Sequence, residues 1–439
     1  MEAAGAEPGG TVRSRTDDQL MRTIGRVRDG AAAESRDMSV DTSPVPATAS
    51  VPVVRPPGRP AAWGGVVALM IGVFALVTAE FLPASLLTPV AVGLHVSEGT
   101  AGQAVTATAL IGIVAGPAIG PLFHRLDRRT LLVGLALLAA LSNILVATAP
   151  AFGVLLLARV LLGIAISGFW SMAVAVAAQL VPAEHLGRAM MIVNTGVSLA
   201  TVVAVPLGAF LGALWGWRAV FVLVAVASVV AAVVQRVLLP RVEPAAGSGV
   251  RALFGALRSP VMIVGLLGIA LLAGGHFMGF TYIRLGASDI PGLTAGGLAM
   301  MLAAYGLGGF AGNLVAGVVA DRRLRTGLVV MPAVLGAAVT VFALLPDQVP
   351  LAIAAVVLWG FAFGGVPTLV QTWAARVEPE RMEAAGGLVV AAFQLAIALG
   401  AAAGGLLVDG AGVREALVAG GVVAVLGGVL LSTARRRRA

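Results

Sequence analysis

Segments of about 20 apolar residues, the length that a membrane-spanning helix needs, recur along this chain from residue 63 to residue 433. Reading the sequence at that length predicts twelve spans. Their residue ranges are 63–87, 102–123, 130–149, 153–180, 189–213, 218–238, 260–283, 294–318, 327–346, 350–375, 384–407 and 413–433. Of the 439 residues, 59% are hydrophobic and 11% charged, which is more apolar surface than a soluble domain could bury. We therefore expect an all-α, multi-pass membrane protein that is surrounded by a lipid bilayer.

The chain carries an internal repeat. The strings Gly120 to Arg125 and Gly317 to Arg322 lie 197 residues apart, and each leads from an apolar segment into a short basic loop. A nearly equal offset relates Glu80 to His276, so an ionisable side chain occurs at matching depth in the first span of each half. Internal repeats with a site between them are typical of secondary transporters. The sequence therefore predicts two six-helix halves related by pseudo-two-fold symmetry.

Composition divides the chain into five parts. Residues 1–62 mix Arg and acidic residues with Pro, Ala, Ser and Gly, which predicts a disordered cytoplasmic tail. Residues 63–238 are the predicted amino-terminal half and residues 259–433 the carboxyl-terminal half. Residues 239–258 read as a cytoplasmic linker, the longest internal loop, and residues 434–439 as a basic cytoplasmic tail.

The charged residues report on topology. The net charge is +8, every cationic side chain is Arg, and the Arg residues gather in the loops on one side of the predicted spans. Both termini should therefore be cytoplasmic, and we expect no nucleic-acid partner. The exclusive use of Arg indicates a GC-rich genome and hence a bacterial inner membrane. With no Cys and four dispersed His, we expect no metal site and no cofactor.

Four strings carry a family resemblance. They are Thr78 to Phe81, Gly120 to Arg129, Arg159 to Gly163, and the Gly/Pro-rich stretch from Gly196 to Gly212. With them the chain resembles the major facilitator superfamily, and within it the twelve-helix drug:proton antiporter branch that includes bacterial sugar-efflux and chloramphenicol exporters. The resemblance covers residues 63–433 and implies a monomeric transporter that is not an enzyme and is driven by the proton gradient.

The resemblance also implies a set of residues that gate the conformational change. In this chain they are Gly120, His124, Arg125, Asp127, Arg129, Pro206, Gly208, Gly317, Asp321 and Arg322. One of them departs from the family, whose loop motif carries Asp where this chain has His124, whereas the second copy keeps Asp321. Asp127, three residues on, is a candidate substitute. The Gly/Pro-rich stretch is expected at the interface between the halves.

Glu80 and Arg159 are the candidate proton-coupling residues. Glu80 lies about 17 residues into its span, or about 25 Å along a helix that rises ~1.5 Å per residue. A carboxyl group shielded from water at that depth can exist in its neutral form, so it can load and release a proton. Arg159 cannot discard its charge and must find carbonyls, a carboxylate or water. The alternatives are an interfacial glutamate and an arginine that only tethers helices.

His276 and several polar side chains are candidates to line a substrate cavity between the halves. The others are Asn194, Asn313, Tyr305, Gln371 and Gln394. For each, the alternative is a packing residue whose polar atoms are satisfied within the bundle.

These observations predict a proton-coupled exporter of small amphipathic compounds that works by alternating access. Import or efflux of a sugar or nucleoside is the alternative within the same fold, although the few aromatic residues, 5% of the chain, argue against a stacked site. A membrane sensor or scaffold that does not transport is the alternative from another class.

Overall fold

The computed structural model describes residues 61–244 and 249–435, which belong to one structural unit. The two tails predicted from composition therefore lie almost wholly outside the described residues. Every regular element in the described ranges is helical.

The amino half contains six membrane-spanning segments joined by short connections, two of which contain a short helix. Its elements are α2 (Trp63–Ser85), α3 (Leu87–Gly93), α4 (Glu98–Leu122), α5 (Arg128–Ala147), α6 (Phe152–Leu180), η1 (Ala183–His185), α7 (Leu186–Leu199), η2 (Ala200–Ala204), α8 (Val205–Trp215) and α9 (Trp217–Leu238). The predicted span 189–213 is built from α7, the π-helical turn η2 and α8. Pro206 follows the π turn directly and lacks the N–H that would continue the regular hydrogen-bond ladder.

The carboxyl half also contains six spans. Its elements are α10 (Val250–Leu257), α11 (Pro260–Phe280), α12 (Ile283–Ala287), α13 (Ala295–Leu344), α14 (Val349–Val377), α15 (Met382–Gly410) and α16 (Val413–Thr433). The short helix α10 lies in the segment that the sequence suggested was a loop. Ser259 caps α11 by accepting a hydrogen bond from the backbone N–H of Met262, and Pro260 occupies the first helical position, which needs no N–H donor.

Helix α13 holds two spans. Its 50 residues would extend about 75 Å at ~1.5 Å per residue, more than twice the ~30 Å of a bilayer core. The backbone leaves the helical region at Arg323 (φ −143°, ψ 47°), where the chain bends back. Among the described residues, eleven helices are long and apolar enough to cross a membrane, and counting α13 twice gives the twelve predicted spans.

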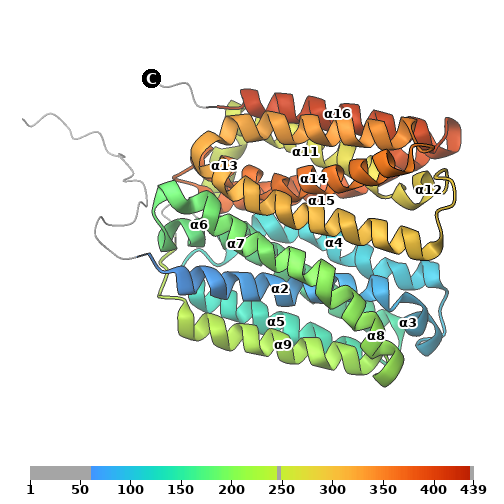
Figure 1. Ribbon diagram of the computed structural model, residues 1–439. Coiled ribbons are helices and arrows are strands. Elements are labelled where there is room, and N and C mark those ends of the chain that lie inside the picture. The colour runs from blue at the N-terminus through green and yellow to red at the C-terminus, as the bar shows by residue number, and fades with distance from the viewer. Residues whose placement is uncertain (1–60, 245–248, 436–439) are drawn as a thin grey trace, which may run out of the picture. The chain divides into compact units, whose positions relative to one another are not determined.

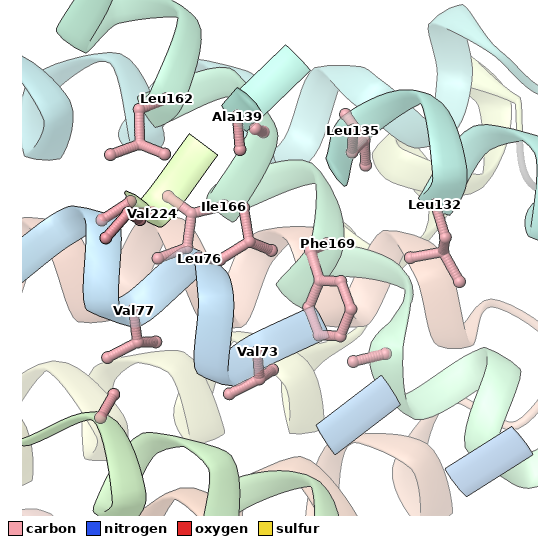
Figure 2. Packing of buried hydrophobic residues seen from close by; sticks show 14 of the residues in the cluster. Val73, Leu76, Val77, Leu132, Leu135, Ala139, Leu162, Ile166, Phe169 and Val224 are labelled. Carbon is pink, nitrogen blue, oxygen red and sulfur yellow. The ribbon is translucent and has the colours of Figure 1, made fainter. Parts of the chain in front are cut away.

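Each half has its own core. In the amino half, side chains of α2, α5, α6 and α9 interdigitate around Leu76, Ile166 and Phe169, as Figure 2 shows. The carboxyl half packs around Trp359 and Phe342. In Figure 1 the amino half, blue to yellow-green, and the carboxyl half, yellow to red, lie side by side, and the helix axes of both halves extend lengthwise across the picture. The halves meet where α4 and α6 contact α15 and where α7 contacts α13 and α14.

The two ends of the bundle differ in charge. One end holds the α4–α5 and α6–α7 connections, the bend of α13 and the α14–α15 connection, and we call it the arginine-rich end. In Figure 1 it is the side at which α16 ends. We call the opposite side, which holds α3, α8 and α12, the far end.

Candidate functional site

Arg159 joins three helices of the amino half through backbone carbonyls. Its guanidinium is fully buried and donates to the carbonyl oxygens of Ala79 (3.0 Å) and Glu80 (3.1 Å) on α2 and of Ala104 (3.4 Å) on α4. The Ala79 carbonyl is available because Pro83, four residues later in α2, has no N–H to donate to it. A proline thus frees the acceptor that a buried guanidinium needs. The three carbonyls satisfy the hydrogen-bonding needs of Arg159 without neutralising its charge.

Glu80 therefore lies beside a cation whose donors are directed at the backbone. The charges of Glu80 and Arg159 are close enough to interact, yet the ion pairs within the described residues do not include this pair. The Glu80 side chain is half-buried, whereas Phe81 next to it is exposed. The Glu80 carboxyl group therefore lies near the Arg159 guanidinium, and the hydrogen bonds and ion pairs found among the described residues do not join the two groups.

His276, the counterpart of Glu80 in the repeat, lies in an aromatic cluster. Its ring stacks on Phe363 (centroids 3.3 Å apart, 7° between planes) and on Phe280 (5.1 Å, 20°). Trp359 Nε1 donates to His276 Nδ1 (3.1 Å). Tyr305 extends the cluster, 4.9 Å from the Phe280 ring. His276 and Trp359 are buried, but Phe280, Phe363 and Tyr305 are only half-buried, so the cluster keeps an accessible aromatic edge.

Sequence reasoning missed this cluster. The low aromatic content of the chain argued against a stacked site, but several aromatic residues of the carboxyl half lie together around His276: Phe277, Phe280, Tyr305, Trp359 and Phe363. A local signal exists, since residues 276, 277 and 280 of α11 and residues 359 and 363 of α14 are spaced to share a helix face. The spacing does not reveal that the two faces and Tyr305 of α13 meet.

Four candidate cavity residues make hydrogen bonds at the interface between the halves. Asn194 of α7 donates to Thr368 Oγ1 and to Gln371 Oε1 of α14, both at 3.0 Å. Asn313 of α13 donates to the carbonyl of Met191 (2.9 Å) and accepts from Thr368 (2.7 Å). Nearer the middle of the bundle, Gln394 of α15 donates to the carbonyl of Ala109 on α4 (3.3 Å).

Two charged contacts join the halves at the arginine-rich end. Arg128, at the start of α5, forms a buried bidentate pair with Glu383 at the start of α15, with N–O distances of 2.7 and 2.6 Å. Asp321 accepts from the backbone N–H groups of Gly187 (2.6 Å) and Arg188 (3.2 Å) at the start of α7. A carboxylate at the amino end of a helix is favoured by the helix dipole. In both contacts a carboxylate lies at the first turn of a helix. Glu383 belongs to the helix whose first turn it occupies, α15, whereas Asp321 comes from α13 and lies at the start of α7.

In the first copy of the loop motif, the contact to the other half is made by Arg128 and not by residue 124. His124 corresponds to Asp321 in the repeat, but it is exposed and its ring contacts the carbonyl of Pro121. Asp127 remains within its own half, where it caps α5 and accepts from the backbone N–H of Val242 (3.0 Å). The contact to the other half comes from Arg128, which sequence reasoning did not single out.

The remaining gate candidates are distributed around this contact region. Gly120 and Gly317 are buried, and Gly317 lies against Met191 of α7. Arg129 donates to the carbonyl of Leu239 (3.3 Å), while Arg125 and Arg322 are exposed. In the Gly/Pro-rich stretch, Gly208 packs on Leu82 of α2. Within that stretch η2 contacts α13 of the other half, whereas Gly196 packs on α2 and α8 packs on α2 and α9.

Comparison with known proteins identifies the family. The profile of the Major Facilitator Superfamily matches residues 69–383 and 285–439. The transcription regulatory protein OpdE of Pseudomonas aeruginosa is 38% identical over 387 residues, which cover 87% of this chain and 96% of that protein. The purine ribonucleoside efflux pump NepI of Salmonella typhimurium is 35% identical over 372 residues, which cover 85% of this chain and 92% of that protein.

Solved structures share the fold. The proton:xylose symporter XylE superposes with a TM-score of 0.71 at 14% identity, covering 84% of this chain and 94% of that one. The human organic anion transporter MFSD10 superposes with a TM-score of 0.70 at 16% identity, covering 85% of this chain and 100% of that one. With twelve spans in two similar halves and a matching family profile, the chain belongs to the major facilitator superfamily.

Proposed function

We propose that this protein is a proton-coupled exporter of flat, weakly polar aromatic compounds, with purine ribonucleosides as the first class to test. The carrying observation is the pair of unlike sites at matching positions of the repeat: Glu80 beside Arg159 in one half, and the aromatic cluster around His276 in the other. The substrate class is supported by NepI, a relative of similar length that is named as a purine ribonucleoside efflux pump.

The two sites have complementary roles in this proposal. A purine ring stacks on the half-buried Phe280, Phe363 and Tyr305. Such stacking contributes about 1–3 kcal/mol of binding free energy per base. Glu80 binds a proton from outside and releases it inside. In the conformation that shields Glu80 from water, the neutral carboxyl group is favoured; in the conformation that admits water to Glu80, the charged carboxylate is tolerated and the proton leaves. Arg159, held by three carbonyls, keeps α2, α4 and α6 in register during the cycle.

Alternating access uses the contacts at the arginine-rich end as the inner gate. With both termini cytoplasmic, as the loop charges indicate, these contacts close the cytoplasmic side in the described conformation. The hydrogen bonds between Asn194, Asn313, Thr368 and Gln371 form the next layer of the same gate. We further propose that the protein works as a monomer in a bacterial inner membrane.

The test is transport in proteoliposomes with an imposed pH gradient. Uptake of radiolabelled adenosine into vesicles that are acidic inside should depend on the gradient. Glu80→Gln should abolish this gradient-driven uptake yet retain adenosine exchange without a gradient, because size and hydrogen bonding are kept. Glu243→Gln, an exposed carboxylate in the linker, is the control. Gradient-driven uptake that is undiminished in Glu80→Gln would show that coupling resides elsewhere.

A sensor is the second candidate, because OpdE, the most identical of the relatives described above, is named as a transcription regulatory protein. A sensor binds the compound without moving it. Adenosine binding to purified protein with neither uptake nor proton flux in vesicles would favour this candidate over the exporter.

A further inference from the structure

A cavity of about 650 Å³ opens at the arginine-rich end of the carboxyl half. It lies between the bend of α13, the last turn of α14 and the end of α16. Its charged lining consists of five arginines: Arg322, Arg323, Arg325, Arg376 and Arg435. None of its lining residues is acidic.

Most of this positive charge has no partner within the described residues. Arg376 donates to the carbonyls of Ala320 and Asp321 (2.8 and 3.2 Å). The other four arginines are exposed, and the hydrogen bonds and ion pairs found among the described residues include none of their side chains. The nearby carboxylate of Asp321 is engaged with the backbone of α7. Four like charges around one cavity repel one another unless an anion enters it.

The bend in α13 gathers these arginines. Three of them lie within four consecutive residues, which a straight helix would distribute around its circumference. The non-helical backbone at Arg323 instead turns the chain at this point, so Arg322, Arg323 and Arg325 all line the cavity.

The corresponding place in the amino half is filled by protein. Helix α9 corresponds to α16 in the repeat, and the chain after α9 folds back over the α4–α5 connection. There the carbonyl of Leu239 accepts from Arg129, the backbone of Val242 pairs with Arg128 and Asp127, and the carbonyl of Glu243 accepts from Gln179.

The sequence after α16 differs in charge from the sequence after α9. It continues as four consecutive arginines, residues 435–438, where the amino half has Leu239 to Val242. Of this run, Arg435 lines the cavity and adds to its positive charge, and no acidic residue among the described ones lines it.

We propose that this cavity binds the phosphate headgroup of an anionic phospholipid from the inner leaflet. Arginine forks match phosphate oxygens in a bidentate geometry. The cavity lies at the ends of spanning helices, which is the level of lipid headgroups, and its other walls include the apolar Leu324, Leu328 and Leu431. A basic pocket between helices at the cytoplasmic surface suits an anionic headgroup, with the acyl chains on the apolar side. This inference does not depend on the transported substrate.

The test compares two triple variants of the full-length protein by native mass spectrometry. Arg323→Gln/Arg325→Gln/Arg435→Gln removes charge from the cavity. Arg236→Gln/Arg241→Gln/Arg258→Gln removes the same charge from exposed positions on the other loops of the same end. The probes are phosphatidylglycerol, phosphatidylcholine and glycerol 3-phosphate. Size-exclusion profiles and the single variant Arg325→Gln check that a loss of binding is not a loss of folding.

The wild type and the control triple should retain phosphatidylglycerol in preference to phosphatidylcholine. The cavity triple should lose affinity by about fivefold for each arginine removed. Equal losses in the two triples would overturn the proposal, since the attraction would then be non-specific. Binding of glycerol 3-phosphate as tight as that of phosphatidylglycerol would also overturn it, in favour of a site for free phosphate esters.

Discussion

At the scale of single residues, Pro83 and Arg159 act together on one backbone carbonyl, although 76 positions separate them in the sequence. The proline leaves the Ala79 carbonyl without its helical donor, and the guanidinium supplies a donor from another helix. Each group removes the cost that the other would incur when buried alone, since an unpaired polar group inside the bundle costs about 1–3 kcal/mol. The same hydrogen bonds hold the positive charge of Arg159 next to Glu80.

The shape of the guanidinium should matter as well as its charge. Arg159→Lys keeps the charge, but one ammonium cannot reach carbonyls on α2 and α4 together, so we expect a loss of about 1.5–3 kcal/mol of stability. Thermal unfolding in detergent measures it. Arg284→Lys, at an exposed position, should leave the melting temperature unchanged. Equal melting temperatures for wild type and Arg159→Lys would show that the carbonyl contacts do not stabilise the fold.

The aromatic cluster gives a second prediction at this scale. Phe280→Leu should raise the KM for adenosine by roughly 5- to 100-fold, because a stack contributes about 1–3 kcal/mol. Phe342→Leu is the matched control, since Phe342 contacts Trp359 from a fully buried position. It should lower stability and leave KM unchanged. A KM that responds to Phe342→Leu but not to Phe280→Leu would argue against substrate stacking on the half-buried edge.

At the scale of helices, the halves approach closely through small residues. Gly387 of α15 lies on the backbone of Gly116 in α4, Gly386 lies on Ser171 of α6, and Gly187 lies on Gly317 and Ala320 of α13. A side chain at any of these places would meet backbone atoms that cannot yield without moving a helix. The glycines thus allow a tight contact at the arginine-rich end without large apolar side chains, whose burial would make separation costly.

A single methyl group should therefore open this contact. A Cβ at residue 187 would lie 2.7 Å from Asp321 Oδ1 and from the Gly317 carbonyl, so Gly187→Ala should push α7 away from α13. The chain has no cysteine, so Ser171→Cys, a buried position, can report opening through its rate of maleimide labelling. The rate should rise in Gly187→Ala. It should not change in Gly153→Ala, where a Cβ meets nothing within 4 Å; equal rates in all three backgrounds would mean that close packing at residue 187 does not hold the gate.

At the scale of the whole molecule, the two halves are similar in fold and different in chemistry. One carries an ionisable pair and the other an aromatic cluster at the matching position. Their contacts at the arginine-rich end, which we propose as the inner gate, are related but not equivalent: Asp321 meets the amino end of α7, whereas Arg128 meets Glu383 at the amino end of α15. The linker fills the outer edge of one half, and the equivalent edge of the other remains an arginine-lined cavity.

The two gate contacts should differ in strength. Glu383→Gln leaves the fully buried Arg128 without its carboxylate, which costs about 3–5 kcal/mol for a buried pair. Arg188→Gln breaks a pair whose arginine side chain is 40% exposed, which costs about 0–1 kcal/mol. Labelling of Ser171→Cys should therefore accelerate strongly with Glu383→Gln and slightly with Arg188→Gln. The reverse order would show that the contact around Asp321 dominates the gate.

The amino-acid sequence by itself determined the number of spans, the division into two halves and the charged character of one end. These properties depend on the apolar length, the repeat and the charge of each segment, all of which can be read locally because lipid requires every spanning segment to satisfy its own backbone. The sequence did not predict the backbone conformation at the bend of α13, at the π turn before Pro206 or at α10. At these places packing decides whether the backbone continues as a helix.

Only the tertiary structure decided which distant side chains meet. Arg159 reaches the carbonyl freed by Pro83, Arg128 reaches Glu383 across 255 positions, and the aromatic residues of α11, α13 and α14 converge on His276. Asn194 bonds to Thr368 and Gln371 of the other half, partners that the sequence did not reveal. Each of these contacts depends on how helices rotate and cross, and that is set by the packing of small and large residues over whole interfaces.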